Sequence, residues 1–188
     1  MHPVPGMAAK AVFLDRDGIL NRALIHGRKS YAPRMLADFR LLPGVTRAVR
    51  ELHRAGFLLV VVTNQPDIGN GLVAPEVVEE MHRRLRGRLP LTEIMVCPHR
   101  QDEGCPCRKP RPGMLVAAAG RFGIDLRRSW MVGDRPSDVE AGLEAGCRTI
   151  FVDRHGFEPC IRPAHAQAGS LPAAAAFILA DAKEAADA

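Results

Sequence analysis

The sequence predicts an α/β fold of three layers, in which helices cover both faces of a doubly wound parallel sheet. Short apolar runs alternate along the chain with segments whose apolar residues recur at helical spacing, as in successive β-α-β units. Residues 57–62 are apolar throughout, which is typical of a strand buried on both faces. The 188 residues suit one domain, residues 1–188, with its core at about 10–155.

The N-terminal half supplies two strands and two helices. The apolar run at residues 11–14 predicts a short buried strand, whereas residues 21–42 lack periodicity and are expected to be irregular. Val45–Leu52 has apolar residues at helical spacing, and the strand at 57–62 follows it directly. Proline is tolerated at the start of a helix, so Pro75–Arg86 is predicted to be the second amphipathic helix.

The C-terminal half continues the alternation. It is predicted to contain strands at 93–96, 130–132 and 149–152, and helices at 113–122, 138–145 and 170–186. Gly146 is placed to end the second of these helices, and Ser170 to cap the last one. Residues 160–169 are expected to form a loop.

Composition and charge favour a soluble protein that binds an anionic substrate, and they argue against a nucleic-acid-binding or membrane-spanning protein. Hydrophobic residues (47%) and charged residues (25%) occur at the levels of a soluble globular protein. The net charge of +5 comes mainly from dispersed arginines, which favours attraction to an anionic substrate. Basic blocks with interleaved aromatics are missing, which argues against nucleic-acid binding. Without a membrane-spanning stretch or a signal peptide in residues 1–10, we expect a cytoplasmic monomer.

Polar side chains recur at the carboxyl ends of the predicted strands, where open parallel sheets bind their ligands. Asp15 and Asp17 follow the first strand. One carboxylate there can attack phosphorus, a second can transfer a proton, and together they can hold Mg²⁺. Such Asp-x-Asp-Gly turns are common, so this turn alone is weak evidence for a catalytic site. The prediction of a site depends on the polar groups that follow it along the chain. These are Thr63-Asn64-Gln65, Arg108-Lys109-Pro110, and Gly133-Asp134 with Asp138.

In these motifs the chain resembles the haloacid dehalogenase-like phosphatases, and among them the small heptose bisphosphate phosphatases and their histidinol-phosphate phosphatase relatives. The resemblance covers roughly residues 10–155 and implies a Rossmann-like core. Between Asp15 and Thr63 there is no room for a large cap domain. The residues that carry the resemblance are Phe13-Leu14-Asp15-Arg16-Asp17-Gly18, Val62-Thr63-Asn64-Gln65, Cys107-Arg108-Lys109-Pro110 with Pro112-Gly113-Met114, and Met131-Val132-Gly133-Asp134.

The resemblance implies a role for each catalytic residue. Asp15 would attack the phosphoryl group and form an aspartyl-phosphate, which water then hydrolyses. Asp17 would protonate the leaving alcohol and afterwards deprotonate the attacking water. Thr63 and Lys109 would bind the phosphoryl oxygens, where a hydroxyl and an ammonium stabilise negative charge.

Magnesium is the cofactor that the resemblance implies. The Asp15 carboxylate, the Asp17 backbone carbonyl and Asp134 would hold it, and it would let an anionic nucleophile approach an anionic phosphate. Asp138 would orient Asp134 or Lys109 from behind, or cap the helix that follows.

The implied substrate is a small phosphorylated sugar, first a heptose bisphosphate, with histidinol phosphate as the nearest alternative. A nucleic-acid 3′-end phosphatase or a basic binding module is the alternative of a different class. The chain departs from the heptose enzymes where Pro66-Asp67 follows Gln65 and where Arg135 replaces a common lysine. The resemblance also implies that Arg108 would bind a second phosphate or a hydroxyl-rich sugar through its planar fork. The predicted substrate contacts are Asn64, Gln65, Arg108 and Arg135.

Three of the five cysteines are grouped with a histidine. Cys97-Pro98-His99 and Cys105-Pro106-Cys107 supply a Cys₃His set, which predicts a closed structural Zn²⁺ site with no open catalytic position. The resemblance to the heptose bisphosphate phosphatases supports this prediction, because those enzymes carry the same arrangement of three cysteines and one histidine. The alternative is a group of reduced, buried cysteines with an incidental histidine. Cys147 is expected in the core, and Cys160 has no evident partner.

Overall fold

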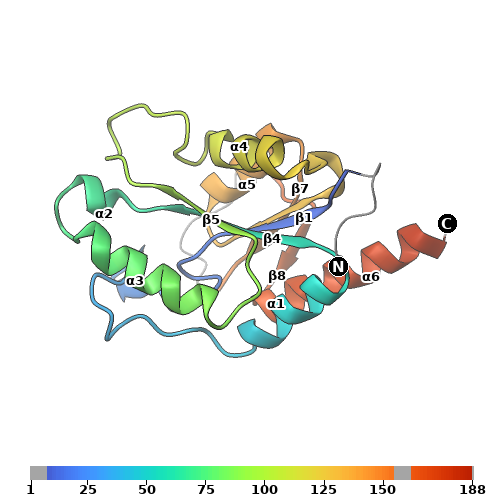
Figure 1. Cartoon of the computed structure of the whole chain (residues 1–188), viewed down its shortest axis with the longest axis horizontal. Helices are drawn as coiled ribbons and strands as arrows, with labels where there is room; N and C mark the ends of the chain where they lie inside the picture. The colour runs from blue at the N-terminus through green and yellow to red at the C-terminus, as the bar shows by residue number, and fades with distance from the viewer. Residues whose placement is uncertain (1–7, 155–161, 188) are drawn as a thin grey trace.

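The computed structural model describes residues 8–154 and 162–187. Its main sheet has six parallel strands in the order β5-β4-β1-β6-β7-β8 (Figure 1). Strand β1 lies inside the sheet, and the chain builds outward from it in both directions, which confirms the doubly wound prediction. The strands are β1 (Ala11–Leu14), β4 (Leu58–Asn64), β5 (Glu93–Cys97), β6 (Trp130–Gly133), β7 (Arg148–Val152) and β8 (Ala166–Ala168).

Helices cover both faces of this sheet, so the fold has the three predicted layers (Figure 1). One face carries α1 (Val45–Arg54), α3 (Pro75–Arg86) and α6 (Leu171–Asp187). The other carries α4 (Gly113–Phe122) and α5 (Pro136–Ala145). Two short helical turns, α2 (Pro66–Gly69) and the 3₁₀ turn Leu126–Arg128, were not predicted.

The core follows from the alternation of side chains along each strand. In β1, Val12 and Leu14 pack in the layer that contains α1 and α6, whereas Ala11 and Phe13 pack in the layer that contains α4. All four side chains are fully buried. A continuous apolar run is therefore what a strand covered on both faces requires.

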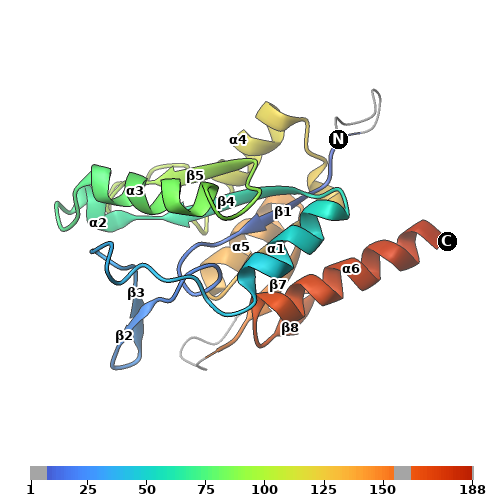
Figure 2. The same ribbon diagram turned by 60° about the horizontal axis from the view of Figure 1, so that its bottom comes forward.

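The segment 21–42, predicted to be irregular, contains a short antiparallel hairpin of β2 (Leu24–His26) and β3 (Lys29–Tyr31). Its strands have three residues each, too few for a periodic pattern in the sequence. Figure 2 shows the hairpin at the same end of the molecule as α2.

The segment 160–169, predicted to be a loop, contains the edge strand β8, so that prediction is wrong there. Ala166–Ala168 has neither β-branched nor aromatic residues, and only its pairing with β7 makes it a strand. Cys160 lies outside the described residues. The predicted cap is confirmed, because the Ala173 amide donates to Ser170 Oγ at 3.3 Å. None of the described helices has the length and apolarity that a membrane span requires.

The parallel register brings the predicted motifs together. Leu14 pairs with Val61 of β4 on one side and with Val132 of β6 on the other. The residues that follow these strands therefore meet at one edge of the sheet, as expected for a doubly wound fold.

Candidate active site

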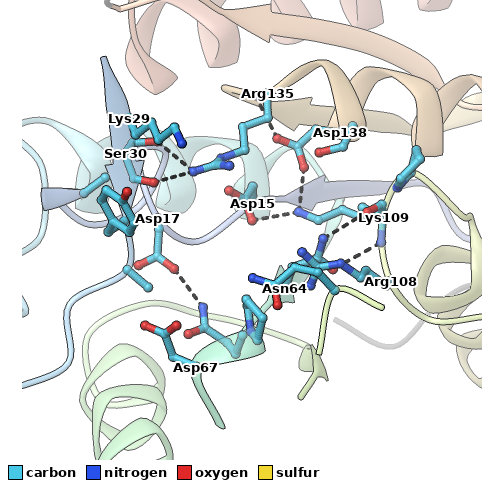
Figure 3. Close-up of a pocket in the computed structure, with 18 residues that line it drawn as sticks. Asp15, Asp17, Lys29, Ser30, Asn64, Asp67, Arg108, Lys109, Arg135 and Asp138 are labelled. Atoms are coloured by element: carbon cyan, nitrogen blue, oxygen red, sulfur yellow. Dashed lines mark hydrogen bonds and ion pairs between the residues drawn. The ribbon is translucent and has the colours of Figure 1, made fainter. Parts of the chain in front are cut away.

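A buried lysine lies at the centre of the site. Lys109 Nζ is 2.7 Å from Asp15 Oδ1 and 2.6 Å from Asp138 Oδ1, and it donates to the Val62 carbonyl at 2.7 Å. Figure 3 shows Lys109 between the two carboxylates. Lys109 is only 4% exposed, so these three acceptors replace water around its ammonium group. The predicted contact of Asp138 with Lys109 is present.

The charges of this cluster do not balance. Burial opposes the charged form of Lys109, but Asp138 and Asp15 outweigh it and raise the lysine pKa. Burial raises the pKa of Asp15 to about 6, although the ammonium of Lys109 opposes the rise. Burial and the negative charges of Asp15 and Asp138 raise the pKa of Asp134 well above its ordinary value. Three carboxylates therefore share one ammonium.

The same cluster fits a divalent cation. One oxygen each of Asp15, Asp134 and Asp138 lies within 4.8 Å of the others. Asp134 Oδ1 is buried and has no hydrogen-bond partner among the described residues. Mg²⁺ prefers carboxylate oxygens, and its charge would offset the excess negative charge. Both oxygens of Asp138 already have partners, Lys109 Nζ and the Arg135 amide, so Asp15 and Asp134 are the better ligands.

Two glycines of the motifs make room for these carboxylates. Gly18 has a φ of +93°, and a Cβ there would lie 2.0 Å from Asp134 Oδ2. A Cβ on Gly133 would lie 2.2 Å from Asp138 Oδ2. Any larger residue at either position would displace a carboxylate of the cluster.

Asp17 is held by three neighbouring side chains. Arg16 donates through Nε and Nη2 to both carboxylate oxygens at 2.9–3.2 Å. Asn21 Nδ2 and Gln65 Nε2 each donate to one oxygen at 2.8 Å. Burial opposes the charged form of Asp17, but the charge of Arg16 and these hydrogen bonds lower its pKa. These contacts therefore favour the ionised form of Asp17.

The predicted residues at the carboxyl end of β4 contact Asp17 and Lys109. Gln65 Nε2 donates to Thr63 Oγ1 at 2.8 Å as well as to Asp17. Asn64 exchanges two hydrogen bonds of 3.1 Å with the backbone of Lys109. Asn64 and Gln65 also line the cavity, whereas Thr63 is 1% exposed beneath it. Direct substrate contact by these side chains stays a prediction.

A cavity of about 610 Å³ opens above the cluster, and its rim is cationic. Lys29 from the hairpin, Arg108 and Arg135 all line it. Arg135 Nη2 donates to the carbonyl and the hydroxyl of Ser30 at 2.6 and 2.8 Å, which fastens the hairpin to the site (Figure 3). Arg108 Nη1 is buried and has no hydrogen-bond partner among the described residues.

Asp67 is the acidic group of this rim. Its carboxylate accepts from Arg34 Nε at 2.7 Å, so its charge is offset within the protein. At the rim, away from the Asp15 cluster, an anionic ligand would therefore meet the charges of Lys29, Arg108 and Arg135 with Asp67 already paired.

Comparisons with known proteins agree with this geometry. Residues 8–142 match the family model described as haloacid dehalogenase-like hydrolase, and residues 106–185 match a second HAD-hydrolase-like model. The chain belongs to the haloacid dehalogenase-like hydrolases. The first match spans all the catalytic motifs from Asp15 to Asp138.

The relatives of this hydrolase include D-glycero-beta-D-manno-heptose-1,7-bisphosphate 7-phosphatases. The one from Pseudomonas putida is 38% identical over 76% of this chain and 82% of its own. The one from Escherichia coli is 39% identical over 78% of this chain and 80% of its own. A crystal structure of D,D-heptose 1,7-bisphosphate phosphatase from B. bronchiseptica, complexed with magnesium and phosphate, aligns with a TM-score of 0.79. It is 29% identical and covers 92% of this chain and 99% of its own.

The predicted Cys/His group is also assembled in this hydrolase. Cys105 Sγ lies 3.5 Å from both Cys97 Sγ and Cys107 Sγ. His99 Nδ1 lies 3.6 Å from Cys97 Sγ and 3.2 Å from Cys107 Sγ. Ordinary Zn–S and Zn–N bonds in a tetrahedron give separations of about 3.8 Å for S···S and about 3.6 Å for S···N. The four atoms therefore fit one tetrahedral Zn²⁺. Cys147 is buried elsewhere, as expected.

Three buried residues around Asp17 lie outside the predicted site. They are Asn21, which donates to Asp17, Arg16, and His82 behind Arg16. Arg16 occupies the variable position between the two aspartates, yet its side chain is fully buried against Asp17. Its Nη1 lies 3.0 Å from Nε2 of His82 on α3, which is also buried. An arginine inside a motif that follows an apolar strand was the available signal for Arg16. For His82 the signal was its position, because Val78, Met81, His82 and Leu85 recur at the spacing of one helix face, although that spacing does not reveal the contact with Arg16.

The shifted pKa of His82 makes the free energy of unfolding depend on pH. Burial, with the charges of Arg16 and Arg86, lowers its pKa from 6.5 to about 4, although Glu79 and Asp17 oppose this. Between pH 6.5 and 4 the imidazole of His82 therefore binds a proton in the unfolded chain but not in the folded chain. The contribution of His82 to the free energy of unfolding is full above pH 6.5 and falls by roughly 3 kcal/mol as pH falls to 4.

Urea unfolding at pH 7 and pH 4.5 checks this prediction. His82→Gln should lose less stability than the parent over this interval. His53→Gln, at an exposed position on α1, is the control and should behave as the parent. Equal losses in the parent and in His82→Gln would contradict the prediction.

Proposed function

We propose that this hydrolase is a Mg²⁺-dependent phosphomonoesterase that removes the 7-phosphate of D-glycero-β-D-manno-heptose 1,7-bisphosphate and releases heptose 1-phosphate. The observation that carries the proposal is the buried Asp15–Lys109–Asp138 cluster beneath a cavity with a cationic rim. The heptose bisphosphate phosphatases among its relatives support the choice of substrate.

Asp15 is the nucleophile of the proposed reaction. Its carboxylate oxygen attacks phosphorus, the ester P–O bond breaks, and the phosphoryl group is transferred to Asp15. Lys109, 2.7 Å from Asp15, offsets the negative charge of the nucleophile and of the incoming phosphoryl oxygens. Water then attacks this aspartyl-phosphate and releases inorganic phosphate.

Asp17 transfers the proton in both steps. The phosphate dianion brings negative charge beside Asp17 and raises its pKa, so that the carboxyl group can carry the proton for the leaving alkoxide. As a carboxylate, the form that Arg16 and the hydrogen bonds favour, Asp17 then accepts a proton from the attacking water. Asn21 and Gln65 keep its oxygens in place during the exchange.

The carboxylates of Asp15 and Asp134, with the backbone carbonyl of Asp17, would hold Mg²⁺. The ion supplies charge neutralisation between the anionic nucleophile and the phosphate. Asp134 Oδ1, which has no hydrogen-bond partner among the described residues, and the excess of carboxylates support this assignment.

The cationic rim favours a substrate with a second phosphate. Lys29, Arg108 and Arg135 lie around the cavity, and Arg108 Nη1 has no partner among the described residues. A planar guanidinium with free N–H groups suits a phosphate. Histidinol phosphate brings an ammonium group instead, which this rim would repel. Tyr31 is the only aromatic residue among the described lining residues, which disfavours a nucleic acid that needs stacking.

A phosphate-release screen with added Mg²⁺ tests the proposed function. The panel contains heptose 1,7-bisphosphate, other sugar phosphates, histidinol phosphate and a 3′-phosphorylated oligonucleotide. We expect heptose bisphosphate to have the highest kcat/KM and to lose one phosphate only. Preference for histidinol phosphate or for the oligonucleotide would overturn the substrate, and no release from any ester would overturn the activity.

The Cys97, His99, Cys105 and Cys107 site is proposed to hold structural Zn²⁺. All four ligand atoms come from the protein, which leaves no position for a substrate. The segment that the ion would fix runs directly into Arg108 and Lys109. Zinc would therefore stabilise the loop that presents the catalytic lysine.

Zinc binding predicts about one metal equivalent per chain after purification. Cys105→Ser should lose the metal and lower the melting temperature by roughly 10 °C. Cys147→Ser is the matched control, because it also replaces a cysteine but lies outside the cluster and should keep the metal. Metal analysis by mass spectrometry and thermal unfolding check both. Zinc-free parent protein, with folding unaffected by Cys105→Ser, would contradict the assignment.

A further inference from the structure

The side chain of Arg16 connects the proposed proton donor to a helix on the face of the sheet. Arg16 is fully buried, and its Nε and Nη2 face the Asp17 carboxylate. Its Nη1 lies 3.0 Å from Nε2 of His82. Among the described residues, Asp17 and His82 are the hydrogen-bond partners of this guanidinium.

The hydrogen bond between Arg16 and His82 has only one possible direction. A guanidinium carries donors and no acceptor, so His82 Nε2 accepts and its proton is on Nδ1. Glu79 Oε2 lies 3.8 Å from that Nδ1, on the side where the positive end of the ring dipole points. Burial and Arg16 lower the pKa of His82 to about 4, which keeps the imidazole neutral and able to accept.

The position of Asp17 suits an acid that acts on the leaving group. In an in-line displacement the leaving oxygen lies on the far side of phosphorus from the nucleophile. In Figure 3 the Asp17 carboxylate points away from Asp15. It accepts a hydrogen bond from Gln65 Nε2 and lines the cavity. Proton transfer depends on holding this carboxyl group within a fraction of an ångström.

We propose that His82 is a positioning residue for catalysis: it holds Arg16, and Arg16 holds the Asp17 carboxyl group where the leaving oxygen is protonated. The inference rests on the proposed phosphatase function. It assigns to α3, through His82, a role in positioning the proton donor. Without an acceptor at position 82, Nη1 of the buried Arg16 loses its partner, and the guanidinium shifts away from Asp17 to find another. Asn21 and Gln65 alone would then hold the carboxyl group.

Leaving-group dependence separates this role from a structural one. p-Nitrophenolate departs without a proton, whereas an alkoxide needs one from Asp17. His82→Leu should lower kcat/KM about tenfold or more for the alkyl phosphate that the parent hydrolyses fastest in the screen above. The loss for p-nitrophenyl phosphate should be less than about twofold. His82→Gln has an acceptor oxygen in reach of Arg16 and should recover most of the lost rate.

Val78→Ala is the matched control, because Val78 is equally buried on α3 and belongs to its apolar face. It should lower the melting temperature and leave the ratio of the two kcat/KM values unchanged. If His82→Leu fails to fold, Arg16→Lys carries the same prediction, since lysine keeps the charge but cannot bridge Asp17 and His82.

The outcomes distinguish this inference from the function on which it rests. A parent enzyme inactive on every ester overturns the proposed function, and the inference with it. An active parent, with His82→Leu lowering both substrates equally or neither, overturns the inference alone. A selective loss with alkyl phosphates, reversed in His82→Gln, supports it.

Discussion

Asp15→Asn is expected to lose phosphatase activity by at least about 10⁴-fold, because an amide cannot attack phosphorus as a carboxylate does. The folded protein should survive the change. Burial raises the pKa of Asp15 to about 6 in a cluster with two other carboxylates, so removing its charge relieves repulsion. In metal-free protein the melting temperature should therefore stay constant or rise.

Phosphate release and thermal unfolding, measured on the same preparations, check this expectation. Asp38→Asn is the matched control, since Asp38 lies outside the lining of the cavity, and it should keep the parent rate. An Asp15→Asn variant that retains a tenth of the parent rate would contradict the assignment of the nucleophile.

Lys109→Met is expected to remove activity and to destabilise the fold together. Lys109 is buried between Asp15 and Asp138, and methionine would fill its space without its charge. The two carboxylates would then face each other without a counter-ion. Removing one partner of a buried ion pair costs about 3–5 kcal/mol in free energy of unfolding.

A double variant separates the two effects. Lys109→Met with Asp138→Asn removes one of the facing charges, and it should regain part of the stability without regaining activity. Lys183→Met, at an exposed position on α6, is the control and should change neither quantity. Urea unfolding gives the stability of each variant. If Lys109→Met is as stable as the parent, the charge balance described for this cluster is wrong.

The catalytic cluster could be predicted because local patterns place its members. Asp15, Thr63 and Asp134 each follow an apolar run that forms a buried strand, and parallel strands bring their carboxyl ends to one edge. Lys109 could be identified because it lies in the motif Arg108-Lys109-Pro110. The spacing of the three cysteines and His99 indicated the metal site. In each case a short segment of sequence carries the signal.

Contacts between distant segments could not be predicted in this way. Arg16, two residues beyond β1, meets His82 only because α3 packs on the same face of the sheet as Val12 and Leu14. The ion pair of Asp67 with Arg34 joins residues 33 positions apart, and nothing in the sequence around either residue indicates it. The hairpin at residues 24–31 and strand β8 are stabilised by pairing that three-residue strands do not reveal. Tertiary packing, which has no local pattern, decides all of these.

Trapping the covalent intermediate tests the central claim most directly. The enzyme is mixed with excess heptose bisphosphate and Mg²⁺, quenched in denaturant and treated with borohydride, which reduces an aspartyl-phosphate to homoserine. Peptide mass spectrometry then locates the reduced residue. The proposed mechanism predicts homoserine at position 15 with substrate and none without it. Turnover that leaves Asp15 unmodified, or homoserine at Asp17 instead, would contradict it.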